Sequence, residues 1–94
     1  MKHIFIVNPA AGKSDRTAEY REMIDAAFAP RGLSYELLVS NAPGECRTLA
    51  RQAAQSGEEV RLYACGGDGT LNEVVNGVVG YGNAAVTHFP GGSG

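Results

Sequence analysis

Short apolar strands alternate with helical stripes along the chain, and this alternation limits the possible folds more than any other feature. Strands are expected at residues 2–7, 33–39, 59–65 and 84–89. Apolar residues with a 3.6-residue period predict three helices between them: one from a cap at Ser14 or Asp15 to Pro30, one from Pro43 to Gly57, and one over 70–79. Strands that alternate with helices pair in parallel through right-handed crossovers. The expected fold is therefore α/β, a parallel βαβαβαβ sheet flanked by helices.

The length and composition allow one core and exclude several classes of protein. Ninety-four residues with 44% hydrophobic side chains fit a single soluble domain, and no apolar run approaches the roughly 20 residues of a membrane span. The net charge of −2 provides no general attraction to nucleic acid. The apolar stretch after Met1 is too short for a signal peptide. We therefore expect a cytoplasmic protein in which Cys46 and Cys65 are small buried hydrophobes.

Charge and glycine are distributed unequally along the chain. Every lysine and arginine lies at or before Arg61, and beyond it only Asp68 and Glu73 carry a charge. Most of the thirteen glycines lie at or after Gly66. A flexible backbone that carries two isolated carboxylates indicates a specific site in the last third of the chain.

Four loops follow the four expected strands, and all four should lie at the same edge of the sheet. They comprise residues 8–13 (NPAAGK), 40–44 (SNAPG), 66–70 (GGDGT) and 90–94 (PGGSG). In a parallel sheet, ligands bind outside the carboxyl ends of the strands. Small residues leave backbone amides accessible, and the first turn of a helix favours anions. The sequence therefore predicts a phosphate site at this edge.

Two common phosphate-binding motifs do not fit these loops. A Walker A loop that ends with the GKS triplet at residues 12–14 requires glycine five positions before the triplet, where Val7 stands. A dinucleotide fingerprint that begins at Gly67 requires glycine at its sixth position, where Asn72 stands. We therefore expect neither a P-loop protein nor a Rossmann dehydrogenase.

The loop at residues 66–70 is the main candidate, and Asp68 is its unusual member. The paired glycines permit positive φ and close approach to a phosphate, and Thr70 is positioned to cap the following helix. A carboxylate about 4 Å from a phosphate is repelled by about 1 kcal/mol in water and by about 4 kcal/mol at an effective dielectric constant of 20. A bridging Mg²⁺ or a proton to accept would give the carboxylate a reason to be there. The alternative is that Asp68 forms an Asx turn or caps the helix.

The same loop carries a resemblance to a known family. Residues 66–77 (GGDGTLNEVVNG) resemble the signature of the diacylglycerol kinase catalytic-domain family, which includes bacterial lipid kinases and sphingosine and ceramide kinases. Residues 8–12 (NPAAG) resemble the family's first nucleotide loop, NPxSG, with Ala11 in place of the usual serine. Ser40 lies where the family often has threonine. Residues 90–94 (PGGSG) resemble the family's fourth loop, which normally continues into Asn-Asp. The resemblance covers the whole chain.

The resemblance implies a fold, an activity and a set of partners. The fold is the amino-terminal, nucleotide-binding lobe of an NAD kinase/diacylglycerol kinase-like enzyme, covering residues 1–94 and truncated before a larger β-rich lobe. The activity is transfer of the γ-phosphoryl group of ATP, with Mg²⁺, to a lipid hydroxyl such as that of diacylglycerol. The resemblance also leaves room for peripheral contact with the inner face of the membrane and for a homodimer. Because the catalytic base is usually placed in the second lobe, we expect residues 1–94 alone to be inactive.

The family's functional residues carry over to matching positions. The residues implied to contact the nucleotide are Asn8, Gly12, Ser40, Gly66, Gly67, Gly69, Thr70, Asn72, Gly92 and Ser93. Asp68 is implied to be the catalytic carboxylate and the Mg²⁺ ligand. Glu73 either acts on the Mg²⁺ indirectly, without ligating it, or is an exposed helix residue. For Asn72 the alternative to a nucleotide contact is that its side chain faces solvent. His88, a lone strand histidine, is expected to be structural.

Three other interpretations stay open. An NAD kinase-like phosphotransferase shares the loop at 66–70, and an assay of NAD against diacylglycerol separates the two. A non-catalytic nucleotide-binding regulator needs only these loops. A receiver-like signalling module requires an acidic pair after the first strand, where Asn8 and Pro9 stand instead, and it ranks last.

Overall fold

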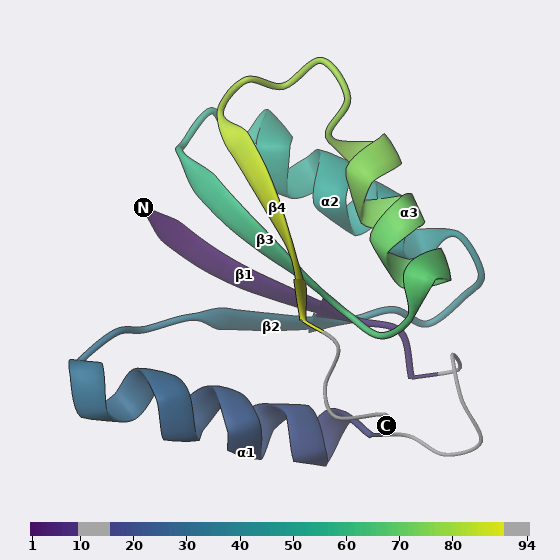
Figure 1. The fold of residues 1–94 in the computed structure, drawn as a ribbon. Helices are drawn as coiled ribbons and strands as arrows, with labels where there is room; N and C mark the ends of the chain where they lie inside the picture. The colour runs from purple at the N-terminus through teal and green to yellow at the C-terminus, as the bar shows by residue number, and fades with distance from the viewer. Residues whose placement is uncertain (10–15, 90–94) are drawn as a thin grey trace.

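The computed structural model describes residues 1–9 and 16–89, and within them four strands form one parallel sheet. The strands are β1 (Lys2–Val7), β2 (Glu36–Val39), β3 (Val60–Cys65) and β4 (Ala84–Phe89), in the spatial order β2-β1-β3-β4 (Figure 1). Each neighbouring pair is parallel. The strands alternate with α-helices along the chain, so the predicted βαβαβαβ arrangement is confirmed.

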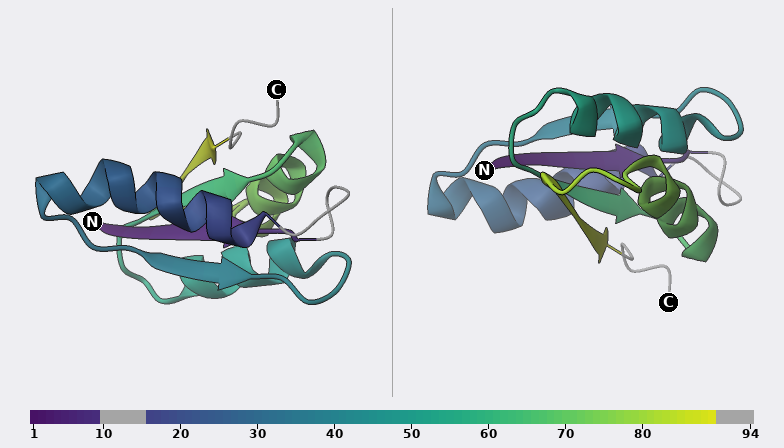
Figure 2. Two further views of the ribbon diagram at one scale, coloured as in Figure 1. Left: turned by 90° about the horizontal axis from the view of Figure 1, so that it is seen from below. Right: turned by 90° about the horizontal axis from the view of Figure 1, so that it is seen from above.

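The helices cover the sheet from both sides. α1 (Thr17–Phe28) lies on one face, and α2 (Glu45–Gln55) and α3 (Asp68–Gly77) lie on the other (Figures 1 and 2). Right-handed crossovers produce this arrangement, because the step from β1 to β2 runs across the sheet in the opposite direction to the two steps that follow. In the part of the chain that the structure describes, none of these helices has the length and apolarity needed to cross a bilayer.

The two faces of the sheet carry different side chains, because successive residues of a strand point to opposite sides. Toward α1, Phe5 stacks on Tyr63 with ring centroids 4.0 Å apart, and Phe28 meets Phe5 edge-on. Toward α2 and α3 the core is aliphatic, and its buried members are Ile4, Ile6, Cys46, Ala50, Val60, Leu62, Ala64 and Val74. Burial of a large side chain of this kind stabilises the fold by about 1.5–3 kcal/mol. The core is therefore built as two layers, one on each face of the sheet.

The second strand is shorter than predicted because its expected first residue completes the end of α1. The helix passes into a 3₁₀ turn (Ala29–Arg31), and Gly32 adopts a left-handed backbone with φ 67°. The amide of Leu33 then donates to the carbonyl of Phe28 at 3.2 Å. Helices commonly end in this way, with a left-handed glycine that lets the following amide bond back to a carbonyl in the last turn. β2 therefore starts at Glu36 rather than at residue 33.

The starts of all three helices also differ from the predicted positions, and α3 covers Asp68–Gly77 rather than residues 70–79. Arg16 occupies the N-cap position of α1, and the predicted caps Ser14 and Asp15 lie outside the described residues. α2 begins at Glu45 after Gly44, which has φ 81°, so this helix starts later than Pro43. Gly44 takes a backbone conformation that other residues rarely adopt.

Both cysteines are buried in the core, as predicted. Cys46 is 1% exposed and Cys65 is fully covered. Burial raises the pKa of the Cys65 thiol from its ordinary value of 9.0 to about 12. Burial is also the main cause of the raised pKa of the Cys46 thiol. Neither thiol is therefore a reactive nucleophile near neutral pH.

We expect the folded protein to lose stability in alkaline solution because of these thiols. A thiol with a raised pKa in the folded chain stabilises that state fully below the unfolded pKa, and this contribution is lost as the pH rises toward the folded pKa, about 12 for Cys65. The free energy of unfolding, measured with urea from about pH 7 to pH 10, should therefore fall at the alkaline end. The fall should be smaller in Cys65→Ala, and an equal fall in both proteins would contradict the prediction.

Candidate functional site

All four strands end together at one edge of the sheet, here called the carboxyl edge. The paired last residues of the strands are Val39, Val7, Cys65 and Phe89. Asn8, Ser40 and Gly66 follow directly, so the first three predicted loops start at this edge, and residues 10–13 of the first loop lie outside the described residues. The amide of Ser40 donates to the carbonyl of Val7 at 2.9 Å and so ties the second loop to the end of β1. The fourth predicted loop, at residues 90–94, lies outside the described residues.

α3 begins at the carboxyl edge without a side-chain cap. Gly67 occupies the N-cap position with an extended backbone (φ −89°, ψ −165°), and its carbonyl accepts the amide of Leu71 at 3.2 Å. Thr70 therefore lies within the first turn, and the prediction that it caps the helix is wrong. Amides of a first turn have no partner inside the helix. This end of α3 is able to bind an anion.

The three glycines of this loop have different structural roles. Gly66 has φ 151°, and a Cβ atom there would lie 2.6 Å from Oγ1 of Thr70. Gly67 and Gly69 do not have positive φ, so the prediction of paired positive φ angles holds for Gly66 only. A Cβ atom at Gly67 or Gly69 would meet no atom within 4 Å. The lack of side chains at these two positions leaves open space beside the first turn of α3.

Two buried oxygen atoms at the carboxyl edge have no hydrogen-bond partner among the described residues. They are Oγ1 of Thr70, a residue that is 3% exposed, and Oε1 of Glu73 on the next turn of α3. Most buried polar atoms in folded proteins are paired, because an unpaired one costs about 1–3 kcal/mol. We interpret these two oxygens as groups that a ligand would pair.

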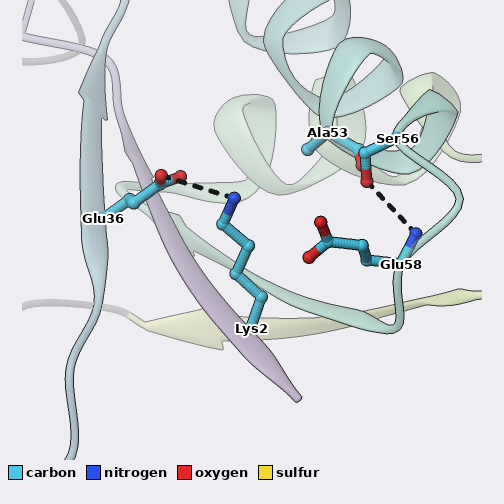
Figure 3. Close-up of polar contacts among 5 residues, drawn as sticks. All are labelled: Lys2, Glu36, Ala53, Ser56 and Glu58. Carbon is cyan, nitrogen blue, oxygen red and sulfur yellow. Dashed lines mark hydrogen bonds and ion pairs between the residues drawn. The ribbon is translucent and has the colours of Figure 1, made fainter.

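The opposite edge of the sheet has polar groups that pair with one another. Nζ of Lys2 lies 3.5 Å from Oε1 of Glu36 (Figure 3). The Ser56 hydroxyl donates to the carbonyl of Ala53 at 2.7 Å and accepts the amide of Glu58 at 3.3 Å. An exposed ion pair of this kind contributes about 0–1 kcal/mol. The contrast supports a ligand site at the carboxyl edge rather than at this one.

A pocket of about 500 Å³ opens between the first two loops and α3. Its lining residues are Asn8, Pro9, Ser40, Asn41, Ala42, Pro43 and Glu73. Its volume lies within the roughly 300–1,000 Å³ that is usual for small-molecule sites. The pocket therefore joins residues of two loops and of α3 that are far apart in the sequence.

Cys46 lies close to two of the pocket residues. After burial, the Cys46 thiol is influenced by a hydrogen bond from Ser40, which lowers its pKa, and by the negative charge of Glu73, which raises it. The amide of Asn41 donates to Oε1 of Glu45 at 2.6 Å and fastens the second loop to the start of α2. These contacts hold the pocket wall in place without a ligand.

The remaining predicted site residues lie in different surroundings. Asp68 is exposed at the first position of α3. Asn72 lies one turn later and is also exposed, and it accepts a 2.6 Å hydrogen bond from Nδ2 of Asn76. This is the solvent-facing alternative that the sequence left open for Asn72. Gly12, Gly92 and Ser93 lie outside the described residues.

Two further side chains, Glu73 and His88, lie at the carboxyl edge, and the sequence left the role of Glu73 open and predicted a structural role for His88. Glu73 is half-buried and lines the pocket rather than facing solvent. Nε2 of His88 lies 2.7 Å from the carbonyl oxygen of Gly66. The available signals were the place of Glu73 one turn after Gly69, and the place of His88 next to the last residue of β4.

The carboxylates at this edge fit a magnesium ion only together with a bound phosphate. Among the described residues, no group of three His, Cys, Asp or Glu side chains is arranged to hold a metal by itself. Mg²⁺ is commonly held by one or two carboxylates together with substrate phosphates and water. The exposed carboxylate of Asp68, beside an uncapped helix end with open space, is the group that could contribute to such a site.

Comparisons with known proteins identify the family of this chain. A family model described as "Diacylglycerol kinase catalytic domain" matches residues 2–94. The Bacillus subtilis (strain 168) protein named "Putative lipid kinase YtlR" is 32% identical over 96 aligned residues, which cover 99% of this chain and 31% of that protein. A Staphylococcus aureus (strain MRSA252) protein named "Diacylglycerol kinase" is 39% identical over 75 residues, covering 78% of this chain and 22% of its own length.

Solved structures of diacylglycerol kinases are also similar to this chain in fold. The crystal structure of a diacylglycerol kinase from Bacillus anthracis str. Sterne has a TM-score of 0.67 and 26% identity, and the match covers 98% of this chain and 33% of that one. The chain thus spans about a third of the length of this structure and of the Bacillus subtilis relative.

Proposed function

The chain belongs to the diacylglycerol kinase catalytic domain family, and we propose that residues 1–94 form the nucleotide-binding lobe of an ATP-dependent lipid kinase. The reaction would transfer the γ-phosphoryl group of ATP to a lipid hydroxyl such as that of diacylglycerol. The observation that carries this proposal is the uncapped amino end of α3, with open space at Gly67 and Gly69 and the unpaired Thr70 hydroxyl behind it.

We assign the phosphates of the nucleotide to the first turn of α3. The amides at residues 67–70 would donate to phosphate oxygens, and these oxygens would occupy the open space beside Gly67 and Gly69. The Thr70 hydroxyl would gain its missing partner from the same ligand. Phosphoryl transfer depends mainly on positioning and on neutralising charge, and this turn of α3 supplies both.

The rest of the nucleotide is assigned to the pocket beside α3. Asn8 and Ser40 line its walls, and the unpaired oxygen of Glu73 would accept a hydrogen bond from the nucleotide or from metal-bound water. Gly12, Gly92 and Ser93 are retained as contacts on the strength of the family resemblance. Asn72 is retained as a nucleotide contact only if its bond to Asn76 opens.

Asp68 is the residue that would hold Mg²⁺, together with phosphate oxygens. Bound Mg²⁺ would neutralise the negative charge that Asp68 and the phosphates share. Asp68 itself would orient the phosphates toward the acceptor. During transfer, the lipid oxygen would form a bond to the γ-phosphorus, the bond to the β–γ bridging oxygen would break, and the hydroxyl proton would pass to a base outside residues 1–94.

We further propose that a second, β-rich lobe supplies this base and admits the lipid between the lobes. Residues 1–94 alone would then bind nucleotide without transferring phosphate. A lipid acceptor also implies a cytoplasmic enzyme that contacts the inner face of the membrane peripherally, with a role in phospholipid metabolism. A homodimer is compatible with this arrangement.

The full-length gene product should phosphorylate diacylglycerol when it is supplied with radiolabelled ATP and Mg²⁺. The test offers diacylglycerol in detergent micelles, NAD, or no acceptor, and follows label in the organic and aqueous phases. Label in the lipid supports the proposal. Phosphorylation of NAD instead would indicate the NAD kinase-like alternative, and nucleotide binding with no transfer to either acceptor would indicate a non-catalytic regulator.

A further inference from the structure

His88 lies at the end of β4 with its side chain bonded to the glycine loop of the neighbouring strand. β4 runs beside β3 (Figure 1). In this pairing His88 lies opposite Ala64, two residues before Gly66. Nε2 of the partly buried imidazole lies 2.7 Å from the carbonyl oxygen of Gly66. This carbonyl belongs to the first residue after β3, beyond the last backbone pairing of the sheet.

The chemistry of this contact determines which nitrogen of the imidazole carries a proton. A carbonyl oxygen only accepts hydrogen bonds, so Nε2 of His88 must be the donor. Both the imidazolium and the neutral imidazole protonated at Nε2 satisfy this requirement. The side chain therefore acts as a fixed donor toward the loop.

Gly66 is held from two directions. Its carbonyl is bonded to His88, and its Cα lies against Thr70, since a Cβ atom on Gly66 would lie 2.6 Å from Oγ1 of Thr70. The peptide between Gly66 and Gly67 is trans and planar, as no cis peptide bond occurs among the described residues. In such a peptide the carbonyl and the next amide N–H point in opposite directions. A bond that fixes the Gly66 carbonyl therefore also fixes the Gly67 amide.

We propose that His88 is a positioning residue: its hydrogen bond to the Gly66 carbonyl orients a backbone amide that binds the nucleotide. By fixing the Gly66–Gly67 peptide, His88 aims the Gly67 amide into the open space at the amino end of α3 before the ligand arrives. The inference rests on the proposed function, because it assigns a phosphate oxygen as the partner of that amide. Preorganisation of a donor improves affinity because no reorientation is needed on binding.

The test compares three variants of the full-length gene product with the wild type. His88→Leu removes the donor, whereas His88→Gln keeps an N–H donor on a side chain of similar reach. Asn83→Ala is the matched control, because Nδ2 of Asn83 also donates to backbone carbonyls, those of Ala54 and Glu58, but at the opposite edge of the sheet. The dissociation constant of Mg²⁺-ATP is measured by calorimetry, and the midpoint of thermal unfolding is measured alongside it.

His88→Leu should raise the dissociation constant of Mg²⁺-ATP roughly fivefold, the factor expected for one hydrogen bond. His88→Gln should restore it to about the wild-type value. Asn83→Ala should lower the unfolding midpoint without changing the dissociation constant. If His88→Leu is too unstable to study, His88→Met, which also lacks a donor, takes its place with the same expectation.

Three results would overturn the inference. Equal affinity in His88→Leu and wild type would show that the Gly66 carbonyl needs no histidine. Equal weakening in His88→Leu and His88→Gln, or in His88→Leu and Asn83→Ala, would show a packing role only. A wild-type protein that binds no nucleotide would overturn the proposed function and this inference together. Nucleotide binding that His88→Leu leaves unchanged would overturn only the role of His88.

Discussion

Replacing Gly77 with valine is expected to destabilise the protein by about 3 kcal/mol or more, a large fraction of the roughly 5–15 kcal/mol that stabilises a typical domain. Gly77 is the buried last residue of α3. A Cβ atom there would overlap the backbone carbonyl of Arg47 and would lie 2.9 Å from Cβ of Ala50, both on α2. A backbone atom does not rotate away, so α2 and α3 would have to separate. Urea denaturation followed by circular dichroism measures the loss.

The size of the substituent and its location separate this effect from a general cost of losing glycine. Gly77→Ala should cost about 1–3 kcal/mol, less than valine. Gly82→Ala should be nearly neutral, because a Cβ atom at Gly82 meets no atom within 4 Å and its φ is not positive. A Gly77→Val protein as stable as the wild type would mean that α2 and α3 do not pack as closely as described.

Replacing Asp68 with asparagine is expected to lower the rate of lipid phosphorylation by the full-length gene product by roughly 100-fold, the scale seen when one preorganised electrostatic group is removed. Asp68 is exposed at the first position of α3, beside the proposed phosphate site. Asparagine keeps the shape of the side chain but loses the charge that would hold Mg²⁺. Because the side chain is exposed, the variant should fold as well as the wild type.

Glu58→Gln is the control for the loss of one negative charge. Glu58 is exposed and lies near Lys2 and Ser56 at the opposite edge of the sheet (Figure 3). Initial rates at saturating ATP, with diacylglycerol micelles and Mg²⁺, should be unchanged in this variant. If the Asp68→Asn enzyme has the wild-type rate, Asp68 has no role in phosphoryl transfer.

The class of fold was predictable because it follows from local patterns. The 2-residue and 3.6-residue periods of apolar side chains mark strands and helices directly, and parallel pairing then brings the strand ends to one edge. The bounds of β1 and β4 were predicted correctly for the same reason. Leu33 was assigned wrongly to a strand because its amide closes the end of α1, a use that hydropathy does not reveal.

The candidate site was predictable only where it depends on loops. Asn8, Ser40 and Gly66 follow strand ends, so their proximity could be inferred from the order of the elements. Thr70 was expected to be a cap because threonine often is one, whereas its hydroxyl is buried within the first turn. The contact between His88 and Gly66 depends on the register of β3 and β4, which no local pattern specifies.

The ATP affinities of the wild type and Asp68→Asn proteins, each measured by calorimetry with Mg²⁺ and again with EDTA, test most directly whether the carboxyl edge binds a nucleotide through a shared cation. With Mg²⁺, Asp68→Asn should bind ATP roughly tenfold more weakly than the wild type, because a metal ligand is lost. With EDTA the order should reverse: Asp68→Asn should bind about fivefold more tightly, because about 1 kcal/mol of repulsion between the carboxylate and the phosphates is removed. The same order of affinities in both conditions would contradict the proposed site.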